Sequence, residues 1–369
     1  MMTTAVNKPQ HLYVHVPFCA HICGYCDFAH IVYRSETVEQ WLEAIEKEIR
    51  AKQIRTDLTT IYVGGGTPTS LSVSELDRFL SLLDPYMESV QEYTIEINPE
   101  TLDEEKCQIL SKHGINRASI GFETSDEKLL KLMGRSQSLS DMHACISLLR
   151  KYGIHNISLD IMYSLPFQTM ESLQKSVKDA VSLDPYHLSL YSLTIEENTV
   201  FDKKGYRSLD EDTEADMYEW ICSFLPEHGY RQYEVSNFAK NGYESRHNCA
   251  YWNYRDFYGI GCGASGKENH ARYDHTKNVR DYISNPLKTE ITNLSKKDEM
   301  FEMWMMSIRL KQGMDLNLFE KTFHISFLDV WRDTTEKLIR DGYLVIRNAH
   351  LCCTEKGYEI MNSLLVEYI

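Results

Sequence analysis

The chain has 369 residues, of which 43% are hydrophobic and 25% are charged, and its formal net charge is −15. This composition is ordinary for a soluble globular protein, and the length suffices for one main domain with an appendage. The negative charge argues against general affinity for nucleic acid or anionic membranes, and no stretch approaches the ~20 apolar residues of a membrane span.

The first predicted element is a strand at residues 12–16, which Pro17 ends and a loop with Cys19, Cys23 and Cys26 follows. Three thiols in so short a loop are too close together to serve three packing roles, and they indicate one inorganic centre. An iron–sulfur cube commonly takes four thiolates, and no fourth cysteine lies nearby. A cube held here would keep one iron open for another ligand.

Two simpler interpretations compete with an iron–sulfur cube. A zinc site would combine these cysteines with His15, His21 or His30. A disulfide fits less well, because three thiols are an odd number and the short polar segment at residues 1–10 does not resemble a signal peptide. Ten cysteines without a targeting segment indicate a reducing compartment, so we expect a cytoplasmic location.

After the cysteine loop, strand and helix patterns alternate. The predicted strands lie at 59–63, 93–98, 117–122, 156–163 and 187–195, and the predicted helices at 36–55, 73–87, 101–113, 125–133, 139–152 and 169–183. With the first strand this gives about six β-then-α units, whose crossovers favour a parallel sheet. Since a full barrel needs eight units and ~250 residues, we predict an α/β fold built on a partial, open (β/α)6 barrel.

The alternation is lost beyond about residue 198, where a helix is expected at 210–228. Residues 295–369 predict two or three helices and a short β-ribbon around 342–346, which resembles a small winged-helix-like α+β domain. We therefore predict a barrel over residues 1–200, an extension over 201–290 and a C-terminal domain over 291–369.

A glycine-rich turn, Gly64 to Pro68, follows the predicted strand at 59–63. It lies at the carboxyl end of that strand, where α/β sheets place their ligands. Glycines there let a ligand approach the backbone, although a tight turn is the simpler interpretation. The turn is not a phosphate loop, because the Gly-Lys-Ser/Thr ending is absent.

Two carboxylates are expected on inward-facing strand positions. Alternation along 93–98 places Glu96 on one face with Thr94 and Asn98, and Asp160 shares a face with Ser158 in the same way. An unpaired carboxylate inside a barrel would cost several kcal/mol, which a cationic ligand would offset. A half-exposed strand is the alternative for Glu96.

The motif Cys-x3-Cys-x2-Cys, with Tyr25 before the last cysteine, resembles the radical S-adenosylmethionine (SAM) superfamily. The segments His-Val-Pro-Phe-Cys and Tyr-Cys-Asp-Phe are similar to those of one branch, which comprises the oxygen-independent coproporphyrinogen III oxidases and the HemW-type heme chaperones. The resemblance implies a radical SAM barrel with a [4Fe-4S] cluster on Cys19, Cys23 and Cys26. It also implies SAM on the open iron.

The resemblance implies a SAM pocket as well. Its residues would be Tyr13, Gly65, Gly66, Thr67, Glu96, Glu123, Arg135 and Asp160. Three positions depart from the family pattern: Glu123 stands where Gln is usual, and Ser164 and Phe167 stand where Gly is usual. These departures concern the fit of SAM rather than the cluster.

Two features separate the branches. The oxidases carry a cysteine two residues beyond the third ligand, and Phe28 stands at that position here. The oxidases also have a longer N-terminal arm before the first ligand than this chain has before Cys19. The segment His247-Asn-Cys-Ala-Tyr251-Trp252 resembles a HemW-type signature associated with heme. Neutral imidazole can ligate heme iron, so His247 is the implied heme residue. A histidine with a purely structural role is the simpler interpretation.

The resemblance thus implies a heme chaperone that binds a [4Fe-4S] cluster, SAM and heme and delivers heme to acceptor proteins. Coproporphyrinogen III oxidation is the alternative, and whether the protein is an enzyme stays open. Expected partners are heme and its acceptors, including membrane-bound ones reached peripherally, and no nucleic acid. A monomer and a heme-linked dimer are both compatible with the sequence.

Overall fold

The computed structural model describes residues 8–369, and its centre is a nine-stranded sheet with the order β11-β1-β4-β5-β6-β7-β8-β10-β9. These strands are β1 (His11–Val16), β4 (Thr60–Gly65), β5 (Glu92–Ile97), β6 (Arg117–Glu123), β7 (Asn156–Tyr163), β8 (His187–Ser192), β9 (Arg231–Glu234), β10 (Asn237–Ala239) and β11 (Tyr258–Ile260). Neighbours from β11 to β8 pair in parallel, whereas β10 is antiparallel to both β8 and β9.

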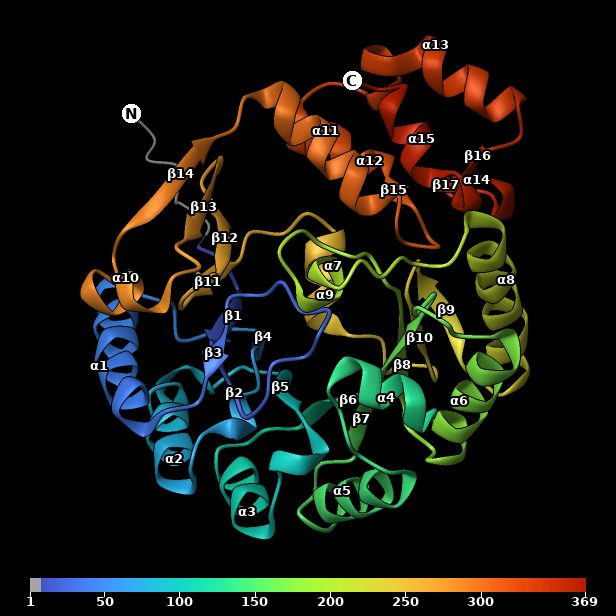
Figure 1. Cartoon of the computed structure of the whole chain (residues 1–369). Helices are drawn as coiled ribbons and strands as arrows, with labels where there is room; N and C mark the ends of the chain where they lie inside the picture. The colour runs from blue at the N-terminus through green and yellow to red at the C-terminus, as the bar shows by residue number, and fades with distance from the viewer. Residues whose placement is uncertain (1–7) are drawn as a thin grey trace, which may run out of the picture.

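The predicted partial barrel is confirmed. Strands β1 and β4 to β8 are the six expected from the sequence, and β11 and β9 form the two edges of an open sheet. Figure 1 shows the strands around a centre with helices outside them. The sequence did not indicate β9 to β11, because strands of three or four residues are too short for a clear alternation.

Helices cover the outside of the barrel. They are α1 (Ser35–Lys52), α2 (Val73–Ser81), α3 (Glu104–Lys112), α4 (Glu127–Met133), α5 (Leu139–Lys151), α6 (Met170–Ser182) and α8 (Glu211–Glu227), whereas the short α7 (Val200–Lys203) lies near the centre of the ring in Figure 1. Ser72 and Glu75 form a capping box that starts α2. This helix ends before the predicted residue 87, because Pro85 lacks the N–H that would continue it and a 3-10 turn, Asp84–Tyr86, follows.

The cysteine loop is closed at its base by two short strands. Strand β2 (Phe18–Cys19) pairs in parallel with β3 (Ile31–Val32), so the intervening loop leaves and returns at one place. Two further 3-10 turns, Pro68–Ser70 and Pro99–Thr101, follow β4 and β5. These turns and the cysteine loop all lie where barrel strands end.

The segment beyond the barrel has its own small sheet. Its elements are α9 (Arg246–Trp252), β12 (Ser265–Glu268), β13 (Ala271–His275), α10 (Val279–Ser284) and β14 (Thr289–Asn293). In Figure 1, α9 lies near the centre of the ring of barrel strands, behind α7. Its position is fixed by hydrogen bonds to β4 and β5, from His247 to Thr60 and from the His247 N–H to Glu92.

The C-terminal part is a winged-helix-like α+β domain, as predicted. It comprises α11 (Lys296–Ser307), β15 (Met314–Asp315), α12 (Leu316–Phe323), α13 (Phe327–Arg340), β16 (Leu344–Arg347), β17 (His350–Cys353), α14 (Glu355–Glu359) and α15 (Met361–Val366). The expected ribbon is β16 paired with β17, and β15 adds a third strand. Helices α14 and α15 exceed the two or three that the sequence indicated.

Two large apolar clusters hold the chain together. The first joins the barrel strands to the outer helices, and it includes Trp41 of α1 together with Met217 and Tyr258 from the predicted extension. The second lies in the C-terminal domain around Trp304 and Phe327. The extension thus shares the core of the barrel. The domain boundaries at residues 200 and 290 stay a prediction.

None of the helices in the described part of the chain combines the length and apolarity that a bilayer crossing requires.

A buried carboxylate ties the extension to the barrel. Glu48 of α1 is 3% exposed and accepts hydrogen bonds from the Tyr282 hydroxyl at 2.6 Å and the Gly261 N–H at 3.1 Å. Its other oxygen lies 2.7 Å from Nε2 of His275. One side chain therefore connects a barrel helix with three positions between residues 261 and 282.

We predict that Glu48→Ala lowers the free energy of unfolding by about 3–5 kcal/mol, because it leaves the buried partners of the carboxylate unpaired. Denaturant unfolding followed by circular dichroism measures this change. The matched control is Glu43→Ala, an exposed position on the same helix, which should cost no more than about 0.5 kcal/mol. Equal effects of the two substitutions would contradict this role for Glu48.

Candidate functional site

A cavity of about 430 Å³ opens at the carboxyl ends of the barrel strands. Most of the residues singled out from the sequence line it, namely Cys19, Cys23, Cys26, Gly65, Gly66, Thr67, Glu96, Glu123, Arg135 and Asp160. They come from the cysteine loop, the turn after β4, strands β5 to β7 and the segment after α4. The fold thus gathers at one site residues that lie far apart in the sequence.

Each of the three thiols has a polar neighbour. Thr67 Oγ1 lies 3.9 Å from Cys19 Sγ and Arg135 Nη1 lies 4.0 Å from Cys23 Sγ. His30 Nδ1 is 3.5 Å from Cys26 Sγ. Hydrogen bonds to ligand sulfurs are one of the means by which a protein tunes an iron–sulfur cluster.

Burial disfavours the thiolate forms. It raises the pKa of Cys19 to about 11 and that of Cys26 to about 12, and it raises the pKa of Cys23 as well. A metal binds the thiolate, so cluster assembly would release these protons. In residues 8–369, no three His, Cys, Asp or Glu side chains converge on one metal ion. A cube binds its cysteines through separate iron atoms, so its ligands need not converge in this way.

The glycine turn is held tightly against the cysteine loop. A Cβ on Gly66 would lie 2.7 Å from the Phe18 carbonyl oxygen and 3.0 Å from Cys19 Sγ. A Cβ on Gly64 would lie 2.6 Å from a carboxylate oxygen of Glu96. A side chain at Gly64 or Gly66 would clash with these neighbours. The glycines therefore allow close packing within the site, in addition to forming a tight turn.

Glu96 points into the cavity, as the strand alternation predicted. Its carboxylate accepts hydrogen bonds from the Gly65 N–H and the Tyr62 hydroxyl, each at 2.9 Å. Burial raises its pKa to about 7 despite these bonds, and the neighbouring Asp160 charge contributes. A cation bound in the cavity would favour the ionised carboxylate.

Glu123 and Arg135 lie together beside Cys23. The Tyr25 hydroxyl donates to Glu123 at 2.9 Å, and Arg135 donates to the Gly121 carbonyl at 2.7 Å. Burial raises the pKa of Glu123, which the Arg135 charge opposes, and the Glu123 charge raises the pKa of Arg135. Glutamate in place of the usual glutamine is thus balanced by a nearby guanidinium.

The sequence did not single out Arg117, which also lines the cavity. Its side chain is 2% exposed, and its Nε has no hydrogen-bond partner within residues 8–369. Asp160 lies on the same wall, accepts a hydrogen bond from Ser119 at 2.9 Å, and has its pKa raised by burial. Alternation along β6 could have indicated Arg117, since it shares a face with Ser119 and Glu123.

The two other departures from the family pattern have a backbone consequence. Ser164 has φ 58° and Phe167 has φ 68°, both in the left-handed region that glycine occupies without strain. The usual glycines at these positions fit this conformation. Neither residue lines the cavity, so these departures affect a turn behind the site.

Two predicted site residues lie outside the cavity. The Tyr13 ring packs 6.0 Å from the ring of Tyr62, which does line the cavity, and its hydroxyl lies 2.9 Å from Nδ1 of His15. His247 is 1% exposed, with Nδ1 2.7 Å from Thr60 Oγ1 and Nε2 2.7 Å from the Tyr251 hydroxyl. Direct iron ligation by His247 would require one of these bonds to break.

Comparisons with known proteins agree with this geometry. The model for the radical SAM superfamily matches residues 13–180, and that for the HemN C-terminal domain matches residues 294–360. The heme chaperone HemW of Lactococcus lactis is 36% identical, covering 99% of this chain and 98% of that protein. The HemW of Bacillus subtilis is 37% identical, covering 97% and 98%.

The chain belongs to the HemW family of radical SAM proteins. Its fold is also that of the coproporphyrinogen III oxidase HemN from Escherichia coli, with a TM-score of 0.83 and 21% identity over 98% of this chain and 90% of that one. At this identity, the likeness to HemN concerns the fold alone.

The residues of this HemW-family chain fit the cluster and SAM that the superfamily implies. Three thiols, a glycine turn that admits close approach and the carboxylates of Glu96, Glu123 and Asp160 line one cavity. The Glu96 carboxylate makes no ion pair within residues 8–369, so it suits a ligand that carries an ammonium or sulfonium group. The separate roles of the lining residues, and those of Tyr13 and His247, stay predictions.

We predict that replacing Cys19, Cys23 or Cys26 by Ser removes the visible absorbance of the reconstituted cluster, because each thiolate holds one iron. Anaerobic reconstitution followed by iron analysis and absorbance spectroscopy measures this. Cys222→Ser, in α8 and outside the cavity, is the control and should retain the cluster. Full iron content and absorbance in all three variants would overturn the assignment.

For the reconstituted HemW-family protein, SAM affinity should rise as the pH increases through about 7, because Glu96 must lose its proton to face a cation. Glu96→Gln should weaken SAM binding by about tenfold, the low end for a hydrogen bond to a charged group, and flatten this pH dependence. Anaerobic equilibrium dialysis with SAM measures both effects. Identical pH profiles for the two proteins would show that Glu96 does not contact SAM.

Proposed function

We propose that this protein is a heme chaperone, which binds heme and passes it to acceptor proteins. The observation that carries the proposal is its relation, over nearly the full length, to proteins named heme chaperone HemW. The family models match parts of both the barrel and the C-terminal domain, so the relation is not limited to one of them.

The loop beside the third cysteine supports this choice over oxidation of coproporphyrinogen III. Phe28 stands where the oxidases carry a further cysteine, lines the cavity and is 62% exposed. An exposed phenylalanine at the mouth of the cavity offers an apolar contact but no thiol. The alternative oxidase function therefore lacks one of its expected groups.

In this proposal the cavity holds the cluster and SAM, with Cys19, Cys23 and Cys26 as iron ligands. A SAM-bound cluster in this superfamily supplies radical chemistry when it is reduced. The chain itself would bind and orient SAM: the backbone at Gly65 and Gly66 approaches it closely, and Glu96 balances a positive charge. Arg135 and Glu123 would shape the pocket beside Cys23.

The proposal also includes the cellular location of the protein and its partners. We expect it to act in the cytoplasm, where its thiols stay reduced, and to meet heme acceptors there or peripherally at a membrane. Heme is cargo rather than a resident cofactor, so its binding must be reversible. A monomer and a heme-linked dimer both remain compatible with this function.

The decisive experiment compares two activities of the anaerobically reconstituted protein. Heme titration followed by absorbance should show stoichiometric binding, and a parallel assay with coproporphyrinogen III, SAM and a reductant should show no decarboxylation. His247→Ala should weaken heme binding by about tenfold, the lower range for loss of a supporting residue. Turnover to protoporphyrinogen IX without heme binding would overturn the proposal.

A matched control keeps that substitution interpretable. His143 is exposed on α5, outside both the cavity and the segment around His247, so His143→Ala should leave heme binding unchanged. Equal weakening by both substitutions would mean that the effect of His247→Ala is not specific to the segment around His247.

A further inference from the structure

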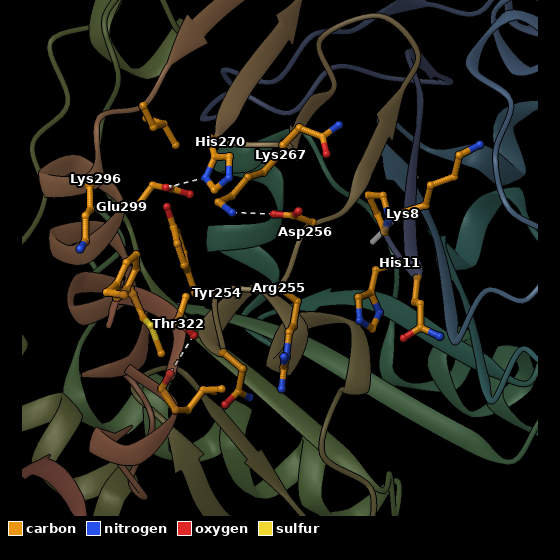
Figure 2. A pocket seen from close by; sticks show the side chains of 18 of the residues that line it. Lys8, His11, Tyr254, Arg255, Asp256, Lys267, His270, Lys296, Glu299 and Thr322 are labelled. Atoms are coloured by element: carbon orange, nitrogen blue, oxygen red, sulfur yellow. Dashed lines mark hydrogen bonds and ion pairs between the residues drawn. The ribbon is translucent and has the colours of Figure 1, made fainter. Parts of the chain in front are cut away.

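A second, larger cavity lies between the barrel and the C-terminal domain. This cleft has a volume of about 1250 Å³ and shares no lining residue with the cavity at the cysteines. Its walls come from the start of β1, the loop after α9 and the C-terminal helices, and Figure 2 shows their side chains converging on it. We call it the lower cleft.

His11 of β1 faces the lower cleft from the barrel side, next to Arg255 (Figure 2). Its Nδ1 lies 2.9 Å from Thr60 Oγ1, and within residues 8–369 its side chain makes no other hydrogen bond. Burial of the ring, aided by the Arg255 charge, lowers the pKa of His11 to about 4. The imidazole is therefore neutral near pH 7, and its Nε2 is available to a metal.

Thr60 connects His11 to the HemW-type signature. Its Oγ1 lies 2.7 Å from His247 Nδ1, and His247 Nε2 lies 2.7 Å from the Tyr251 hydroxyl. When Nε2 of His11 binds a metal, its Nδ1–H donates to Thr60 Oγ1, and the Thr60 hydroxyl donates to His247. A metal-bound histidine commonly has its other nitrogen held by such a partner.

The remaining lining matches the rest of a metalloporphyrin. Leu294, Met303, Leu318 and Phe323 give the cleft an apolar wall, suited to the macrocycle. Lys8, Arg255 and Lys296 also line it and make no ion pair within residues 8–369, so these three cations suit propionate carboxylates.

The carboxylates of the lower cleft are already partnered. Asp256 pairs with Lys267 at 2.6 Å, and Glu299 lies 2.7 Å from Nδ1 of His270 (Figure 2). They therefore oppose an anionic ligand less than free carboxylates would. Lys8, Arg255 and Lys296 thus give this cleft a local excess of positive charge, although the net charge of the chain is −15.

We propose that the lower cleft is the heme-binding site and that Nε2 of His11 is an axial ligand of the iron. This inference rests on the proposed function, because it assumes that the protein binds heme. His247 is then a positioning residue, which acts through Thr60 and does not touch the iron. The separation of the two cavities places heme apart from the cluster and SAM.

The test is titration of the full-length protein with ferric heme, read by absorbance and by electron paramagnetic resonance. His11→Ala should weaken binding by at least about tenfold and remove the signature of imidazole ligation. Added free imidazole should restore that signature in His11→Ala. His247→Ala should weaken binding but keep it, since His11 remains.

Two outcomes would overturn the inference. The imidazole signature could persist in His11→Ala, or it could be lost when His270, a cleft histidine bonded to Glu299, is replaced by Ala. Failure of the proposed function would look different, because then the unaltered protein would bind no heme. Cluster absorbance retained by His11→Ala shows that the variant is folded, since His11 lies outside the cysteine cavity.

Discussion

Parallel pairing of the barrel strands is the constraint on which the rest of the structure depends. Because β1, β4, β5 and β6 run in one direction, their carboxyl ends meet at one edge. The cysteine loop, the glycine turn and the carboxylates of Glu96 and Glu123 are therefore brought to one cavity. A slip by one residue in any of these strands would turn its inward side chains outward and remove them from the site.

The cavity contains more buried charge than its own residues satisfy. Burial raises the pKa of Glu96 and that of Asp160, while Arg117 lies on the same wall and its Nε finds no hydrogen-bond partner in the described part of the chain. Such groups are costly in an empty, dry interior, and they are tolerated in a cavity that water or a charged ligand fills. A ligand with both cationic and anionic groups, as SAM has, complements this arrangement.

Helix α9 separates the two cavities. Asn248 lines the cavity at the cysteines, whereas Asn253 and Tyr254, just after the helix, line the lower cleft. His247 lies between them, buried and hydrogen-bonded on both ring nitrogens. A signature associated with heme can therefore act by holding a wall in place, without contact between its histidine and the iron.

The sequence by itself determined the features that depend on local periodicity and spacing: the six barrel strands, the inward face of Glu96 and the cysteine loop. The family resemblance added the roles of the pocket residues. Only the tertiary structure decided which distant groups meet. Tyr13 lies behind Tyr62, and His247 bonds to Thr60, 187 residues away. Such contacts depend on strand register and helix placement, which the packing of the whole core sets and no local pattern encodes.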